Sequence, residues 1–123
     1  MLFRSAVEEV RAQARAIERR LRAGRPAVPL EGATCVLVDD GLATGASMRA
    51  AVAWARARGA ARVVVSAPVS SVGAADALRA EADAVACVHE SDALSSVGEW
   101  YDDFGQVRED EVVALLSDPT KEV

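Results

Sequence analysis

Aromatic residues are scarce in this chain. Phe, Trp and Tyr make up 4% of the 123 residues, whereas hydrophobic residues as a whole reach 51%. Because aromatic side chains normally fill much of a protein core, their scarcity predicts a core of small aliphatic side chains, chiefly Ala and Val. The length suits one modest domain, and we expect residues 1–123 to form a single domain.

Cysteine, histidine and lysine are also rare, which excludes several kinds of site. Cys35 and Cys87 stand in apolar runs, with no metal-ligand spacing and no disulfide framework. Reduced thiols of this kind are typical of the cytosol, so we expect a cytoplasmic protein. The single histidine, His89, has no evident catalytic partner, and we interpret it as a polar residue at a strand end.

No basic stretch is free of acidic residues, and the formal net charge is −5. The arginines near the N-terminus are interleaved with glutamates, which favours a solvated helical face over a polyanion site. They are Arg11, Arg15, Arg19, Arg20, Arg22 and Arg25. We therefore expect no nucleic-acid partner. No apolar run approaches the ~18 residues that cross a membrane, so we expect no membrane association either.

The hydrophobic pattern predicts a helix followed by an alternating α/β segment. Apolar residues spaced 3 and 4 apart predict a helix over residues 5–23 that packs on a sheet. The continuous apolar run over 35–38 indicates a strand over 34–39 that is buried on both faces. The further expected strands are 62–67, ended by Pro68, and 84–88; the further helices are 47–58, 72–81 and 109–116.

Strands joined by helices of this length must run parallel, with right-handed crossovers. The sequence thus predicts an α/β fold with an open, mainly parallel sheet and flanking helices, of the doubly wound kind. In such sheets ligands bind beyond the carboxyl ends of the strands. The first strand ends in Asp39-Asp40, and a loop of small residues follows it.

This loop, Gly41–Ser47, has the composition of a phosphate cradle. Small residues let backbone N–H groups approach an anion, and the helix N-terminus behind them favours negative charge. Thr44 and Ser47 add hydroxyl donors, although either could also cap the helix. The loop lacks the G-K-[ST] of a Walker site and the G-x-G-x-x-G of a dinucleotide fold.

Two carboxylates beside a phosphate cradle suit a phosphorylated sugar, whose vicinal hydroxyls donate hydrogen bonds to the acids. Successive strand residues point to opposite faces, so one of Asp39 and Asp40 should face the ligand at a time. An alternative is a flavodoxin-like phospho-acceptor domain. That class needs a lysine downstream of its acids, and the only lysine here is Lys121.

The string VLVDDGLATGAS resembles the phosphoribosyl-pyrophosphate (PRPP) binding motif of type I phosphoribosyltransferases. Many members have an aliphatic residue where this chain has Gly41. A poorly characterised bacterial branch has glycine there, and the strings RAGRPAVPLEGATCVLVDDGLATGASMRAAV and VGEWYDDFGQV are similar to that branch. The resemblance extends from the first helix nearly to the C-terminus.

The resemblance implies transfer of ribosyl 5-phosphate from PRPP to an acceptor base, with pyrophosphate leaving on Mg²⁺. Asp39 and Asp40 would bind the ribose hydroxyls and stabilise the oxocarbenium-like transition state by their charge. The 5-phosphate would be held by five loop residues: Ala43, Thr44, Gly45, Ala46 and Ser47. Mg²⁺ would be bound through PRPP, with no direct protein ligand. The acceptor base is unidentified, and the sequence leaves open whether the protein forms a homo-oligomer.

Trp100 and Tyr101 are candidates for the acceptor side of the site, although core packing is the interpretation we favour. Members of this branch have a further half-domain before the first helix, with a pyrophosphate loop and a lid. We therefore expect this chain to be the C-terminal portion and inactive by itself. A non-catalytic module that senses PRPP or a nucleotide is the alternative.

The two ends of the chain carry separate expectations. Leu2-Phe3-Arg4-Ser5 is the translation of a common sequencing-adapter end, so we expect residues 1–5 to be non-native. A genomic locus with the same start behind a native stop codon would contradict this. Residues 117–123 are expected to form a frayed tail.

Overall fold

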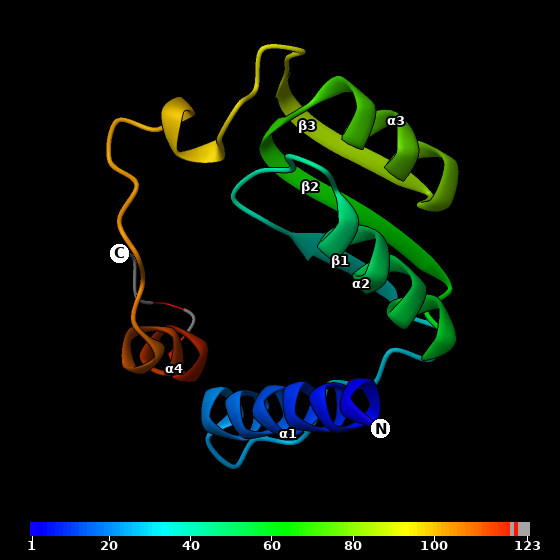
Figure 1. Ribbon diagram of the computed structural model, residues 1–123. Helices are drawn as coiled ribbons and strands as arrows, with labels where there is room; N and C mark the ends of the chain where they lie inside the picture. Colours follow the sequence, from blue (N-terminus) through cyan, green and yellow to red (C-terminus); the bar gives the residue numbers. More distant parts are fainter. Residues whose placement is uncertain (119, 121–123) are drawn as a thin grey trace. The chain divides into compact units, whose positions relative to one another are not determined.

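A computed structural model describes residues 1–118 and 120 of the chain (Figure 1). The chain forms two compact units. Residues 29–104 make up one of them, and residues 1–28 with the described part of 105–123 make up the other. The single domain over 1–123 stays a prediction.

The unit 29–104 is built on a parallel three-stranded sheet. Its strands are β1 (Thr34–Val38), β2 (Arg62–Ser70) and β3 (Ala84–Glu90), in the order β1-β2-β3. Helices α2 (Ala46–Ala57) and α3 (Val72–Glu81) connect them. The predicted open, parallel α/β sheet with flanking helices is confirmed.

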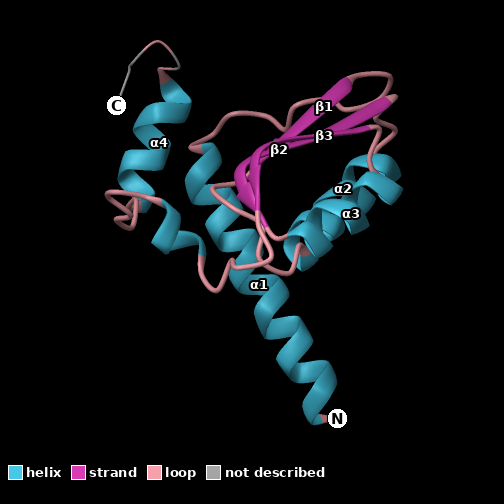
Figure 2. Ribbon diagram, turned by 90° about the horizontal axis from the view of Figure 1, so that it is seen from above, coloured by secondary structure: helices cyan, strands magenta, loops and turns pink. Residues whose placement is uncertain are grey.

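Both connecting helices cover the same face of the sheet (Figure 2). Because the strand order does not reverse, two right-handed crossovers must place their helices on one side. The doubly wound arrangement, with helices on both faces, is therefore not found within residues 29–104. The prediction that the first strand is buried on both faces is wrong for the same reason: Val36 is 57% exposed and Val38 is 72% exposed.

The core between the sheet and the two helices consists of small aliphatic side chains, as predicted. Val63, Val65 and Leu78 are each 0% exposed. Methyl-rich residues of α2 and α3 surround them, and partly buried Cys35 and Leu37 of β1 close the cluster. No aromatic residue of the described chain is buried. Such a core depends on close backbone approach, because small side chains reach only a short distance.

β2 runs through Pro68 to Ser70, so the prediction that Pro68 ends this strand is wrong. β1 stops at Val38, which pairs with Ser66, and the register between β2 and β3 skips Pro68. A proline lacks a backbone donor and is tolerated where the ladder does not need one. The other predicted elements of this unit are present, and no end is shifted by more than two residues.

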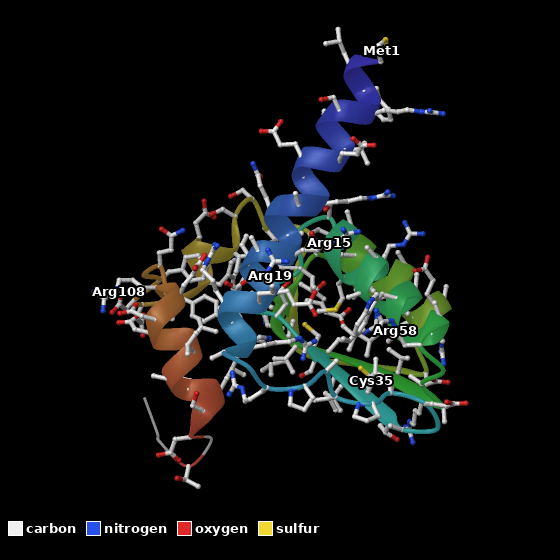
Figure 3. The ribbon with its side chains drawn as sticks, turned by 90° about the horizontal axis from the view of Figure 1, so that it is seen from below. Met1, Arg15, Arg19, Cys35, Arg58 and Arg108 are labelled. Carbon is white, nitrogen blue, oxygen red and sulfur yellow. The ribbon has the colours of Figure 1, made fainter. Side chains whose placement is uncertain are left out.

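In the other unit, α1 (Leu2–Arg22) lies against α4 (Glu109–Ser117). Arg20 Nε donates to Glu109 Oε2 at 2.8 Å, which fastens the two helices. The lining of a hollow of about 650 Å³ contains Leu116 and three apolar residues of α1: Ala14, Ile17 and Leu21. Within this unit α1 thus packs against a helix. The expected packing of α1 on a sheet stays a prediction. Arg15 and Arg19 stand on the exposed surface of α1 (Figure 3), as expected of a solvated face.

The expected frayed tail, 117–123, falls mostly outside the described residues: Ser117 ends α4, and of the rest only Asp118 and Thr120 are described. Across the described part of the chain, we find no helix with both the length and the apolar character needed to cross a membrane.

Candidate functional site

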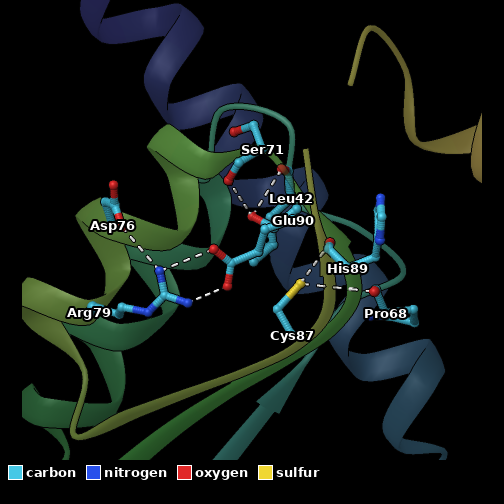
Figure 4. Close-up of polar contacts among 9 residues, drawn as sticks. Leu42, Pro68, Ser71, Asp76, Arg79, Cys87, His89 and Glu90 are labelled. Carbon is cyan, nitrogen blue, oxygen red and sulfur yellow. Dashed lines mark hydrogen bonds and ion pairs between the residues drawn. The ribbon is translucent and has the colours of Figure 1, made fainter. Parts of the chain in front are cut away.

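The segment after β1 is tied to β2 at both ends. The Asp39 N–H donates to the Ser66 carbonyl at 3.1 Å, and the Leu42 N–H donates to the Val69 carbonyl at 3.0 Å. The Ser71 N–H in turn donates a hydrogen bond of 2.8 Å to the Leu42 carbonyl. Leu42 is buried, 2% exposed, and Figure 4 shows it beside Ser71. The residues between these anchors therefore form a fixed turn at the carboxyl end of the sheet.

A cavity of about 200 Å³ opens over this turn. Its lining contains Asp39 and all five loop residues predicted to bind phosphate. The full set is Asp39, Gly41, Leu42, Ala43, Thr44, Gly45, Ala46, Ser47, Met48 and Val97. Asp40 is exposed and is not part of this lining. Its N–H donates to Asp39 Oδ1 at 2.9 Å. Both acids are exposed, and Asp39 alone of the two lines the cavity.

The loop presents unused donors to this cavity. Within the described residues, the N–H groups of Thr44, Gly45 and Ser47 have no acceptor. α2 starts at Ala46, so its partial positive charge lies at the same place. The Thr44 hydroxyl accepts from the Ala46 N–H at 3.3 Å, whereas Gly45 is the residue at the cap position. Donors and helix end together suit an anion with several oxygens.

The start of α3, with its N-cap residue Ser71, supports the loop. Gly45 has φ 76°, a conformation that favours glycine, and a Cβ there would lie 3.2 Å from Ala74 Cβ. The Ser71 hydroxyl donates to the Ala43 carbonyl at 2.6 Å and accepts from the Ala74 N–H at 3.1 Å. Our sequence interpretation missed this role of Ser71. A serine directly before a predicted helix is a typical N-cap, so the cap was detectable and its bond to Ala43 was not.

Trp100 and Tyr101 lie at the end of the short 3₁₀ helix η1 (Val97–Trp100). The Trp100 ring packs against His89, with ring centroids 4.7 Å apart. The Tyr101 hydroxyl donates to the Asp40 carbonyl at 2.5 Å. Neither residue lines the cavity. Trp100 is 40% exposed and Tyr101 is half-buried, so the core packing that we favoured is wrong. A role at the acceptor side stays a prediction.

Asp39 is the one charged side chain in the cavity lining. Arg49, one turn into α2, is engaged by Glu81 of α3, with Nε 2.8 Å from Oε1. The hydrogen bond from Arg49 lowers the pKa of Glu81 below its ordinary value. Among the described residues, no three His, Cys, Asp or Glu side chains gather into a metal-binding group. The cavity therefore offers a ligand backbone donors, hydroxyls and one carboxylate.

Comparison with known proteins identifies the family. The model of the phosphoribosyl transferase domain matches residues 6–105. The chain belongs to this family. Two Mycobacterium tuberculosis proteins, from strains CDC 1551 / Oshkosh and ATCC 25618 / H37Rv, are provisionally named phosphoribosyl transferases. Each is 42% identical to this chain over 97 residues, which cover 79% of the chain and 22% of the relative.

A solved structure is also similar. The crystal structure of TT1426 from Thermus thermophilus matches with a TM-score of 0.79 and 39% sequence identity, over 92% of this chain and 56% of that chain. The chain thus spans about a fifth of the length of the mycobacterial relatives and just over half of the Thermus protein. The family resemblance inferred from VLVDDGLATGAS is confirmed.

Proposed function

We propose that the cavity over Asp39–Ser47 binds PRPP, and that the protein transfers ribosyl 5-phosphate to an acceptor base. The observation that carries the proposal is the joint presence of Asp39 and the phosphate-loop residues in one cavity lining. The family match over residues 6–105 supports the same reaction class. Because the chain spans part of its relatives' length, the activity is proposed for the complete protein.

In this proposal the 5-phosphate is bound by the loop. Its oxygens accept from the N–H groups of Thr44, Gly45 and Ser47, which have no acceptor within the described residues. Ala43 and Ala46 contribute small side chains that let the phosphate approach the backbone. The hydroxyls of Thr44 and Ser47 add two donors, and the start of α2 favours the negative charge. No lysine or arginine side chain is needed.

The ribose lies beside the acids. Asp39 accepts hydrogen bonds from ribose hydroxyls inside the cavity, and Asp40 does so from its solvent side. In the reaction the bond from C1 to the pyrophosphate oxygen breaks, and its electron pair leaves with pyrophosphate. A new bond forms from the acceptor nitrogen to C1, and that nitrogen loses a proton. The positive charge that develops on the ribose is stabilised by the fixed negative charge of the two acids.

Mg²⁺ would enter with PRPP. Phosphate and hydroxyl oxygens are the hard ligands it prefers, and PRPP would supply both, with no direct protein ligand. The ion would offset the negative charge of the leaving pyrophosphate. The acceptor base stays unidentified.

Calorimetric titration of the folded chain with PRPP and Mg²⁺ tests the proposal. We expect saturable binding, and we expect the Asp39→Ala, Asp40→Ala double variant to lose it. A Glu8→Ala, Asp92→Ala double variant is the matched control, because it changes the net charge equally at two exposed acids. Among the described residues, neither of these has a polar side-chain partner. Binding that survives loss of both site acids would overturn the assignment.

The complete protein then distinguishes transfer from sensing. Release of pyrophosphate on addition of a purine or pyrimidine base, absent without the base, would support transfer. PRPP binding with no pyrophosphate release across a panel of bases would favour the regulatory module. The same Asp39→Ala, Asp40→Ala variant serves as the inactive reference in this assay.

A further inference from the structure

We propose that Tyr101 is a positioning residue for the acid pair, and that Gly41 provides the space in which its segment docks. This inference deepens the proposed PRPP site and rests on it. Tyr101 does not line the cavity, so its role is to hold the turn that carries Asp39 and Asp40.

Tyr101 acts through one hydrogen bond to the main chain. Its hydroxyl donates to the Asp40 carbonyl at 2.5 Å, across 61 residues of sequence. That carbonyl belongs to the peptide group that joins the second acid to Gly41. On the strand side, the Asp39 N–H is held by the Ser66 carbonyl at 3.1 Å. The two acids are therefore fixed from both directions, by the sheet below and by Tyr101 from a later segment.

Gly41 is what lets this later segment approach. Its φ is not in the left-handed region, so its backbone would accept any residue. A Cβ at this position, however, would lie 2.5 and 2.6 Å from the two methyl carbons of Val97, and 3.1 Å from Val69 Cγ1. Val97 is β-branched and stiff, so it cannot turn away cheaply. An aliphatic residue at position 41 would displace η1 from the turn.

The docking segment, residues 97–104, packs against itself, so the position of Val97 also determines the position of Tyr101. The Tyr101 and Phe104 rings lie 5.2 Å apart between centroids. A Cβ on Gly98 would meet Phe104 Cδ1 at 2.9 Å, so this ring closes over the start of η1. The Ser95 hydroxyl donates to Glu99 Oε2 at 2.7 Å on the approach to it. The contact of Val97 with Gly41 therefore also places the Tyr101 hydroxyl within hydrogen-bond distance of the Asp40 carbonyl.

Tyr101→Phe removes the hydroxyl and leaves the ring. The first measurement needs no ligand: the backbone carbonyl ¹³C shift of Asp40 and the ¹⁵N shift of Gly41, compared with wild type by NMR. We expect both to move, while the resonances of β2 stay in place. The second measurement is PRPP–Mg²⁺ affinity by calorimetry, which we expect to fall about three- to tenfold, the usual range for one hydrogen bond.

Phe104→Leu is the packing control. It loosens the same aromatic pair and keeps the Tyr101 hydroxyl. If Tyr101 only stabilised the fold, both variants would lower Tm and neither would change the affinity of the folded chain. A positioning role requires weaker PRPP binding in Tyr101→Phe than in Phe104→Leu, whatever their Tm values. Equal affinities in the two variants would overturn the proposal.

The role of Gly41 is tested by rescue. Gly41→Ala should shift the Asp40 carbonyl resonance and weaken PRPP binding, because its Cβ meets Val97. Adding Val97→Ala removes both methyl carbons and should restore the Asp40 carbonyl resonance, which is read without ligand because Val97 also lines the cavity. No recovery in the Gly41→Ala, Val97→Ala double variant would contradict the docking mechanism.

Failure of this inference is separable from failure of the proposed function. If wild type does not bind PRPP, the proposed function fails, and the ligand-free resonances still decide whether Tyr101 and Gly41 hold the acid turn. If wild type binds PRPP and the Asp40 resonance of Tyr101→Phe is unchanged, the site stands and the positioning role is wrong.

Discussion

Asp83, one residue before β3, joins the far end of the sheet to α2. Its Oδ2 accepts from the Val63 N–H at 2.7 Å and lies 2.8 Å from Arg56 Nη1. The bond from the Val63 backbone, followed by that from Arg56, lowers the pKa of Asp83 below its ordinary value of 3.8. The folded state therefore prefers the ionised carboxylate more than the unfolded state does.

This preference predicts a pH dependence. A carboxyl with a lowered folded pKa stabilises the fold fully above its unfolded pKa, and the contribution is lost as pH falls through the folded pKa. Asp83→Asn keeps an acceptor for Val63 and removes the charge. We expect it to lower Tm at pH 7, with the difference from wild type shrinking below pH 3.8, as followed by circular dichroism.

Asp92→Asn provides the control, since this exposed acid has no polar side-chain contact within the described residues. Its Tm should follow wild type across the pH range. A constant Tm difference for Asp83→Asn down to pH 3 would show that charge is not the cause.

At single residues, what the sequence could predict is set by distance along the chain. Asp39 and the loop up to Ser47 are contiguous, so their shared cavity follows from a strand, a loop and a helix in order. The bond from Tyr101 to Asp40 spans 61 residues, and no local pattern encodes it. Gly41 is recognisable as a departure from the usual motif, but its reason, the methyl groups of Val97, exists only in three dimensions.

Among the elements, α3 has the most direct influence on the site through Ser71. This residue caps the helix through the Ala74 N–H and holds the loop through the Ala43 carbonyl. We expect Ser71→Ala to destabilise the chain by about 1 kcal/mol, the usual cost of losing an N-cap. PRPP affinity should fall as well, because the loop loses an anchor. Urea unfolding and calorimetry measure the two effects.

Ser71→Thr keeps the hydroxyl and should retain most of both properties. A Ser71→Ala variant with weakened stability and unchanged PRPP affinity would mean that the cap matters to α3 alone and that the loop holds its shape without it.

Element ends and faces were predictable to different degrees. α3 has the predicted bounds, Val72–Glu81, and Ser71 caps its start. The end of β2 was not predictable from Pro68, since the penalty of a proline depends on whether a neighbouring strand needs its N–H. The exposure of one face of β1 was not predictable for a similar reason. An apolar run tells how hydrophobic a strand is, whereas the side on which helices lie follows from strand order.

For the molecule as a whole, burial is concentrated in one unit. Every buried residue of the described chain lies between Leu42 and Leu78, whereas α1 and α4 contain none. Amides exchange through openings whose free energy follows local burial. We therefore expect hydrogen exchange to be slowest in β2 and fastest in the first turns of α1.

Exchange followed by NMR or mass spectrometry checks this expectation. Protection in α1 equal to that of Val63 and Val65 would contradict it, and would mean that the helix is covered in solution. Our sequence prediction of an α/β sheet needed only the alternation of strands and helices. The separation into two units could not be predicted, because it depends on which surfaces meet.

The two anchors of the acid turn, Asp39 on Ser66 and Leu42 on Val69, carry an evolutionary consequence. Both acceptors belong to one rigid strand, so the number of residues between the anchors is fixed by the strand's own repeat. A sequence may drift at these positions, but an inserted or deleted residue would break one anchor. Across homologues, we expect alignment gaps to avoid residues 39–42, while loops without such paired anchors vary in length.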